Sequence, residues 1–278
     1  MLPFRRHLPV VIALAAAAAP TGARALVTPA TTSTPTSAAA AQATFDHSAF
    51  DRLLKAHVRD GMVDYDAFKS SAEFKQYLAA LAAADPSRLS RPEQVALWIN
   101  AYNAYTIELI NKHNERGSIR NINKSFGVVK AYGPWQEKLA TVGGRAYGLD
   151  EIEQGILRKQ YREPRIHFAL VCAAKGCPPL RSEAYTGARL DAQLDDQART
   201  FLLKSPNKNR VDVATRTVYL SPIFVSFRDY IKDFGGSEAS VGKYIAHYFP
   251  AGPERQLLES GQFRVEKTGY DWSLNKQG

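Results

Sequence analysis

The most constraining feature of the chain is an apolar run that ends at a cysteine. Residues 166–171 are apolar except for His167, Cys172 follows at once, and a short loop then carries Cys177 and two prolines. The length of the run and its β-branched and aromatic side chains predict a buried strand that leads into a loop. Reactive side chains are often found on loops at strand ends, where a rigid scaffold holds them. We therefore expect a functional site around residues 165–180.

The first 44 residues have the composition of a targeting segment followed by a linker. Two arginines and a histidine at positions 5–7 precede an apolar run over residues 8–19, and Ala23-Arg24-Ala25 has the small-x-small pattern of a cleavage site. This order predicts a signal peptide over residues 1–25, and the run is short for the alternative, an uncleaved membrane anchor. Residues 26–44, rich in Ala, Thr, Ser and Pro, predict a flexible linker. We expect a periplasmic or secreted protein with no stable membrane anchor after removal of the signal peptide.

The rest of the chain carries alternating helix and hairpin signals. Helices are expected over residues 48–57, 70–81, 92–112, 150–160, 191–203, 221–234, 238–247 and 253–259, three of them opened by the capping patterns Ser70-x-x-Glu73, Ser90-x-x-Glu93 and Asp150-x-x-Glu153. Gly143-Gly144 and Thr215-Arg216 predict the turns of two hairpins, and residues 262–266 predict a further strand. The pattern predicts an α+β fold: a single domain over residues 45–278, with several helices around a small, mainly antiparallel sheet.

The strongest helical segment, residues 92–112, carries two asparagines on one face. Asn100 and Asn103 are three residues apart, and asparagine is a poor helix former because its amide competes for backbone groups. Beside Trp98 and Tyr102 they indicate a buried polar site with fixed hydrogen bonds. The alternative is that both amides point to solvent or to a neighbouring loop. We assign Asn100 and Asn103, together with Arg158, to substrate binding.

Several short motifs together resemble a known family, the domain of unknown function 547 of bacteria and plants. They are Trp98-Ile-Asn-Ala-Tyr-Asn103, Asp150-Glu-Ile-Glu153 with Leu157-Arg158, Arg165-Ile-His-Phe-Ala-Leu-Val-Cys172, Cys177-Pro-Pro-Leu180 and Tyr185, and the resemblance covers residues 94–203. The family name states no activity. Plant members can carry Ser at the position of Cys177 and keep the first cysteine. The resemblance therefore implies that a disulfide is not a general family feature and that Cys172 is the better functional candidate.

A cysteine-centred hydrolase or acyl transferase is the first functional hypothesis. Such chemistry needs a thiolate, a histidine within hydrogen-bond reach and a third group that orients the histidine. Cys172, His167 and Glu153 (or Glu151) supply these types. His167 and Cys172 are five residues apart, so on a continuous strand they face opposite sides, and the pair requires either a turn at Cys172 or another histidine. The alternatives are a core histidine and an inert cysteine.

Two further hypotheses use the same segment without a free nucleophile. Thiols outside the cytoplasm tend to be oxidised, and Cys172–Cys177 is the one intramolecular disulfide that two cysteines allow. The pair predicts thiol–disulfide exchange, although redox motifs favour two intervening residues instead of four. The other hypothesis is a non-catalytic cell-envelope binding or interaction module for a small-molecule, peptide or envelope ligand. Its polar face would consist of Asn100, Asn103, Glu153, Arg158 and His167.

Composition and motifs argue against other classes of function. The formal net charge of +9 falls to +6 without residues 1–25, which contain three arginines and no acid, and no basic stripe with interleaved aromatic residues is present. We therefore expect no nucleic acid partner. Cys-x-x-x-x-Cys with a lone histidine supplies too few clustered ligands for zinc. Neither a metal nor a cofactor is expected.

Overall fold

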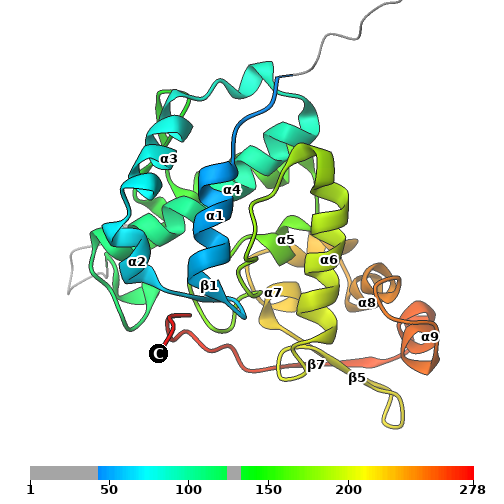
Figure 1. The fold of residues 1–278 in the computed structure, drawn as a ribbon. Coiled ribbons are helices and arrows are strands. Elements are labelled where there is room, and N and C mark those ends of the chain that lie inside the picture. Colours follow the sequence, from blue (N-terminus) through cyan, green and yellow to red (C-terminus); the bar gives the residue numbers. More distant parts are fainter. Residues whose placement is uncertain (1–42, 124–132) are drawn as a thin grey trace, which may run out of the picture. The chain divides into compact units, whose positions relative to one another are not determined.

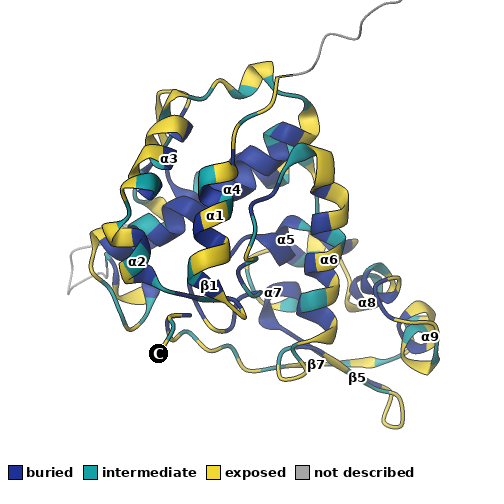
Figure 2. Ribbon diagram, viewed as in Figure 1, coloured by how far each residue is buried: buried dark blue, intermediate teal, exposed yellow. Residues whose placement is uncertain are grey.

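Helix α4 (Arg91–Lys112) is buried along almost its whole length and is the central element of the fold (Figure 1; Figure 2). This computed structural model describes residues 43–123 and 133–278. The Ser90 hydroxyl oxygen accepts a hydrogen bond from the backbone N–H of Glu93, and Pro92 lies in the first turn, where no helical hydrogen bond is lost. A helix that is apolar on most of its surface has to be covered on all sides. The predicted helix and its cap are confirmed, and other elements pack around it.

The chain before residue 150 surrounds α4 with helices and two short hairpins. In order, the elements besides α4 are α1 (Ser48–His57), β1 (Val58–Arg59), β2 (Met62–Val63), α2 (Tyr65–Ser70), α3 (Ala72–Ala83), η1 (Pro86–Arg88), η2 (Ile119–Asn121), η3 (Pro134–Gln136), β3 (Ala140–Val142) and β4 (Arg145–Tyr147). β1 pairs antiparallel with β2, and β3 pairs antiparallel with β4 across the predicted glycine turn. The cap of α3 is Ser71 instead of the predicted Ser70, because Ser70 is the last residue of α2.

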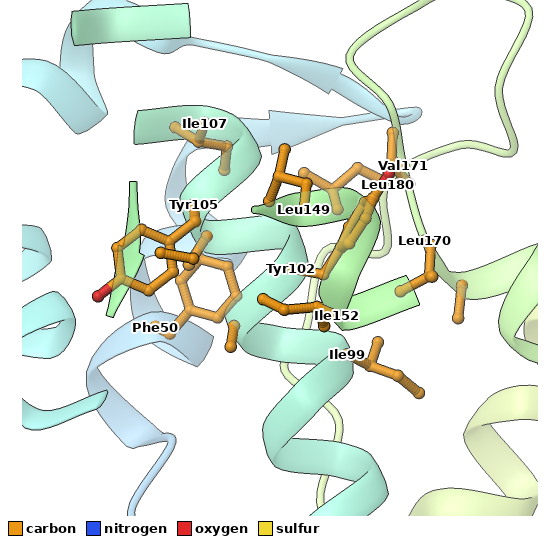
Figure 3. Close-up of a cluster of buried hydrophobic side chains, with 14 of the residues drawn as sticks. Phe50, Ile99, Tyr102, Tyr105, Ile107, Leu149, Ile152, Leu170, Val171 and Leu180 are labelled. Carbon is orange, nitrogen blue, oxygen red and sulfur yellow. The ribbon is translucent and has the colours of Figure 1, made fainter. Parts of the chain in front are cut away.

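A first hydrophobic core lies between α4 and the elements around it. Figure 3 shows some of its members: α4 supplies Ile99, Tyr102 and Tyr105, α1 adds Phe50, and the π-helix η4 (Glu151–Tyr161) adds Ile152. The helix predicted over residues 150–160 is therefore present, although the Asp150 side chain does not cap it. The signal peptide predicted over residues 1–25 and the linker as far as residue 42 lie outside the described residues, and Ala43 forms a β-bridge with Leu89.

The strand predicted over residues 166–171 is wrong: its first four residues form a short helix, α5 (Ile166–Ala169). Its burial was predicted correctly, since all six residues are buried. Ile166 and Ala169 belong to the first core, whereas Phe168 belongs to a second core. A helical turn places residues 166 and 169 on one side and residue 168 on another. In a strand, residues 166 and 168 would share a face and residue 169 would lie on the opposite one. A short apolar run does not distinguish these two conformations by periodicity.

The second core lies among the elements that follow α5 (Figure 1). These are η5 (Gly187–Arg189), α6 (Leu190–Leu203), β5 (Arg210–Asp212), β6 (Thr217–Leu220), α7 (Pro222–Val225), η6 (Tyr230–Phe234), α8 (Glu238–Ala246), α9 (Pro253–Ser260) and β7 (Arg264–Lys267). Strand β6 pairs antiparallel with β5, as the predicted second hairpin requires, and parallel with β7. Phe168, Phe201 and Phe224 meet in this core.

The helix predicted over residues 221–234 is interrupted. Ser221 caps α7 as predicted, but α7 ends at Val225, and Arg228 adopts a left-handed backbone conformation (φ 48°) before η6 begins. The interruption lets Phe227 pack against Tyr270, with ring centres 4.7 Å apart, and lets Arg228 pair with Asp150 at 2.5 Å. These tertiary contacts outweigh the local preference for a continuous helix.

The predicted fold class is confirmed. Residues 41–278 form one unit in which helices dominate and the described strands lie in three small, mainly antiparallel sheets. No helix among residues 43–123 and 133–278 combines the length and the apolar character that a membrane crossing requires.

Candidate functional site

A pocket of about 270 Å³ lies where the two cores meet, and the three predicted catalytic candidates, Cys172, His167 and Glu153, line it. The first core contributes Tyr102 and Leu170 to its wall, and the second contributes Ile223 and Tyr230. The other lining residues are Trp135, Asp150, Glu153, His167, Cys172, Cys177, Pro178, Ser226, Phe227, Arg228, Tyr270 and Trp272.

The local backbone brings His167 and Cys172 to the same pocket. His167 lies on α5, and the chain leaves this helix in an extended conformation at Leu170. Ala173 then adopts a left-handed conformation (φ 59°), which turns the chain directly after Cys172. The expectation that a continuous strand would hold the two side chains on opposite sides is therefore wrong. The turn at Cys172, which the sequence left open, is present, and both residues line the pocket.

A carboxylate orients His167, and it belongs to Asp233. The Nε2 of His167 lies 2.6 Å from Asp233 Oδ2, and both carboxylate oxygens of Asp233 also accept hydrogen bonds from Arg158. Burial alone would raise the pKa of Asp233, but the hydrogen bonds from His167 and Arg158 outweigh it and lower this pKa to about 2. An ionised carboxylate can only accept hydrogen bonds, so Nε2 carries the proton. Nδ1, which has no hydrogen bond to any described residue, is then free to accept one.

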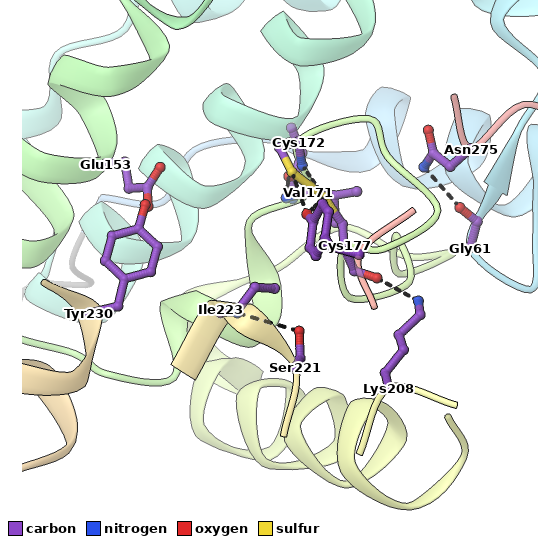
Figure 4. Close-up of a disulfide and its surroundings, with 12 residues drawn as sticks. Gly61, Glu153, Val171, Cys172, Cys177, Lys208, Ser221, Ile223, Tyr230 and Asn275 are labelled. Atoms are coloured by element: carbon purple, nitrogen blue, oxygen red, sulfur yellow. Dashed lines mark hydrogen bonds between the residues drawn. A yellow bond between two sulfur atoms is a disulfide. The ribbon is translucent and has the colours of Figure 1, made fainter. Parts of the chain in front are cut away.

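Glu153, the orienting group expected from the sequence, has a different partner. It is buried, and its Oε1 accepts a hydrogen bond from the Tyr230 hydroxyl (Figure 4). Burial raises the pKa of Glu153, and nearby His167 opposes this shift. Tyr230 also packs on His167, with ring centres 4.3 Å apart. The carboxyl group is therefore held beside the imidazole without bonding to it.

The two cysteines form the expected disulfide, which borders the pocket (Figure 4). No cysteine of the chain is free in this state. The Tyr270 hydroxyl lies 3.1 Å from both sulfur atoms, and the backbone N–H of Cys172 donates to Cys177 Sγ at 3.1 Å. Cys177 is buried and Cys172 is half-buried. A thiolate at Cys172 therefore exists only after the disulfide is reduced.

The three residues assigned to substrate binding make contacts within the protein. Asn100 exchanges two hydrogen bonds with the backbone of Tyr185. Asn103 donates to the carbonyl of Ala169 at 3.0 Å and accepts from the N–H of Val171 at 3.0 Å. Both amides are buried and have fixed hydrogen bonds, as predicted, and neither faces solvent; Asn100 bonds a neighbouring loop at Tyr185, which the alternative also allowed. Neither these amides nor Arg158 line the pocket beside the disulfide, and their substrate-binding role stays a prediction.

Several site residues had no recognisable signal in the sequence. Asp233 belongs to no motif, and it follows His167 by 66 residues. Tyr230, Tyr270 and Trp272 line the pocket from the last fifth of the chain. An aromatic cluster at residues 270–272 is visible in the sequence, but only the fold connects it to His167.

Comparison with protein families identifies one segment of the chain. Residues 86–202 match the family described as "Protein of unknown function, DUF547". The chain therefore contains a segment that is similar to this family, the DUF547 segment. The match agrees with the resemblance over residues 94–203 apart from an earlier start. Comparison with curated proteins and with solved structures gave no match.

The DUF547 segment supplies only part of the pocket. It contains both cysteines, His167 and Glu153, whereas Asp233, Tyr230 and the residues around Tyr270 follow it. Among the described residues, no group of three or more His, Cys, Asp or Glu side chains is arranged to hold a metal ion.

Proposed function

We propose that this protein is a cysteine-centred hydrolase or acyl transferase that becomes active when its disulfide is reduced. One observation carries the proposal. Cys172 and His167 border the same pocket, and Asp233 holds the opposite nitrogen of His167. A nucleophile, a base and a group that orients the base are the parts that thiol-dependent acyl transfer requires.

The proposed chemistry follows from these positions. Reduction breaks the Cys172–Cys177 bond, and His167 Nδ1 takes the proton of the Cys172 thiol. The thiolate attacks the carbonyl carbon of an acyl substrate, and the leaving group departs with a proton returned by His167. Water or another acceptor then attacks the thioester and frees Cys172. Asp233 keeps the proton of His167 on Nε2 throughout, and Arg158 keeps Asp233 ionised. Tyr270 is placed to donate a hydrogen bond to the thiolate.

In the proposed cellular location, the disulfide would control whether the enzyme is active. The signal sequence predicted over residues 1–25 and the linker that follows it support export to the periplasm or beyond. Thiols in that compartment are oxidised unless a reductant acts on them. The enzyme would then stay inactive until a thiol reductant of the envelope opens Cys172–Cys177.

A non-catalytic cell-envelope binding module is the second candidate. The disulfide supports it, because the oxidised protein offers no free thiol beside this aromatic-lined pocket. A thiol–disulfide redox protein is a third candidate, supported by the half-buried sulfur of Cys172.

Labelling of Cys172 with iodoacetamide tests the enzyme proposal. The Cys177→Ser variant frees Cys172 without any reductant, and Cys172→Ser is the matched control that frees only Cys177. We expect Cys177→Ser to react at pH 7 at least tenfold faster than a cysteine in an unstructured peptide, because a neighbouring imidazole stabilises the thiolate. His167→Asn should remove most of this advantage. A rate equal to that of the peptide, unchanged by His167→Asn, would leave the binding module as the better proposal.

A further inference from the structure

We propose that the pocket beside the disulfide binds a small organic ammonium group, seated between the Glu153 carboxylate and the aromatic rings around Trp272. As a statement about the substrate of the enzyme, the inference rests on the proposed function. As a statement about binding, it does not need a reactive thiol. The charges, the rings and the size of the pocket support it separately.

The charges of the pocket leave one carboxylate without a directly paired cation. Asp150 and Arg228 both line the pocket and neutralise each other at 2.5 Å. Glu153 is buried and forms no ion pair with any described residue; His167 and Arg228 favour its charge without contacting it, and the Tyr230 hydroxyl is the one hydrogen-bond donor that the structure gives it. A buried carboxylate without a cation is costly in its ionised form, so it either takes up a proton or attracts a positive ligand. An ammonium group entering the pocket supplies the missing charge.

Aromatic rings form another part of the wall. Trp272 packs against Tyr270, Phe227 and Trp135, with ring centres 4.6, 5.8 and 6.2 Å away, and all four rings line the pocket. The negative faces of such rings attract cations, and aromatic enclosures are a recurrent way of binding ammonium groups. The Trp272 ring already attracts one cation, since the Arg120 guanidinium lies 5.1 Å from its centre. Arg120 does not line the pocket, so it does not fill this space.

The volume limits the size of the bound group. Pockets for drug-sized ligands measure roughly 300–1,000 Å³, and this one measures about 270 Å³. It therefore takes an aminoalkyl group and not an extended chain. Because Cys172 and His167 line the same space, an acyl group attached to that amine would lie beside the proposed nucleophile. The structure thus favours acyl substrates that carry an amine a few bonds from the carbonyl.

Three probes of equal length and different charge test the inference. Binding of butylammonium, butanol and butanoate to the oxidised full-length protein is measured by titration calorimetry at millimolar concentration. We expect butylammonium to bind at least tenfold more tightly than butanol and butanoate. Equal binding of butylammonium and butanol would show a merely apolar pocket, and tighter binding of butanoate would assign the site to Arg228. Either result overturns the inference.

Matched variants locate the binding energy. Glu153→Gln keeps the shape of the side chain and removes its charge, so butylammonium binding should fall at least tenfold while butanol binding stays unchanged. Trp272→Phe keeps an aromatic face and should bind, whereas Trp272→Leu should lose at least fivefold. The circular dichroism spectrum and the unfolding midpoint of each variant show whether it is folded. Wild-type affinity in folded Glu153→Gln would refute the assignment.

The same probes separate this inference from the proposed enzyme. Butylammonium binding by the oxidised wild type involves no free thiol, so the site stands even if Cys172 proves unreactive in Cys177→Ser. In Cys177→Ser, saturating butylammonium should slow the labelling of Cys172 at least threefold. Binding without such protection would refute the claim about the substrate.

Discussion

The amide of Asn103 should be a major source of stability, because it ties the central helix to the segment that carries the site. Its side chain is buried and makes two hydrogen bonds of 3.0 Å, one to the carbonyl of Ala169 and one from the N–H of Val171. In Asn103→Ala both backbone groups lose their partner in a place that water does not reach. A buried polar group left without a partner costs about 1–3 kcal/mol. For the two groups together, the expected loss in the free energy of unfolding is therefore about 2–6 kcal/mol.

Asn111 on the same helix provides a matched control. It is also buried, but its oxygen accepts one hydrogen bond, from Arg116 at 3.2 Å, and its amide nitrogen has no partner among the described residues. Asn111→Ala therefore removes one long hydrogen bond and also removes an unsatisfied donor. We expect it to cost less than about 1 kcal/mol.

Guanidinium unfolding of the oxidised proteins measures the difference. The two alanine variants remove the same atoms from the same helix, so the difference between them reports the backbone partners and not the helix propensity. A common slope against denaturant concentration shows that both variants unfold by the same transition. Equal losses for the two variants would refute the role assigned to the Asn103 amide.

Three shorter predictions follow from other contacts. The pKa of Asp233 is about 2 in the folded protein and 3.8 when unperturbed, so ionisation of Asp233 stabilises the fold at higher pH. About 2 kcal/mol of the unfolding free energy should be lost as the pH falls from about 4 to about 2. In Asp233→Asn, the unfolding free energy should change less with pH over this range. Tyr270→Phe removes the hydroxyl that lies 3.1 Å from both sulfur atoms. After reduction, the Cys172 thiol of this variant should therefore be alkylated more slowly at pH 7 than that of the wild type, because its thiolate loses a hydrogen-bond donor. Gly61 and Gly144 both have positive φ, but an added Cβ would lie 2.5 Å from Pro179 only at Gly61, so Gly61→Ala should lower the thermal midpoint clearly more than Gly144→Ala, and equal shifts would contradict the clash.

Local signals in the sequence located many elements but not their neighbours in space. The cap at Ser90 and the glycine pair at residues 143–144 gave correct elements, because each acts on the backbone within a few residues. The same reasoning failed at residues 166–171, where burial suits a strand and a helical turn equally well. It failed again at residues 226–229, where contacts with Asp150 and Tyr270 interrupt a helix.

Sequence motifs marked some residues of the candidate site but not those that contact them. Cys172 and His167 stand out because their types are rare and lie in one motif. The carboxylate that contacts His167 does not stand out in the sequence. The chain has 27 Asp and Glu residues, and no spacing identifies Asp233 among them as the partner of His167. Glu153 was the reasonable choice from its motif, yet the fold gives it Tyr230 as partner and brings Asp233 to His167. Which carboxylate contacts His167 depends on distances in the folded protein, and separation along the sequence does not determine these distances.

The position of α5 explains why the pocket needs residues beyond the DUF547 segment. Ile166 and Phe168, on either side of His167, are anchored in different cores. The ring of His167 is therefore fixed only when both cores are packed, and its partner Asp233 follows the matched residues 86–202. The disulfide is tied to the last part of the chain in the same way, because Tyr270 contacts both sulfur atoms. A change in the packing of the second core must consequently alter the imidazole and the disulfide together, even where the changed residue, such as Val241 or Leu258, lies outside the family segment.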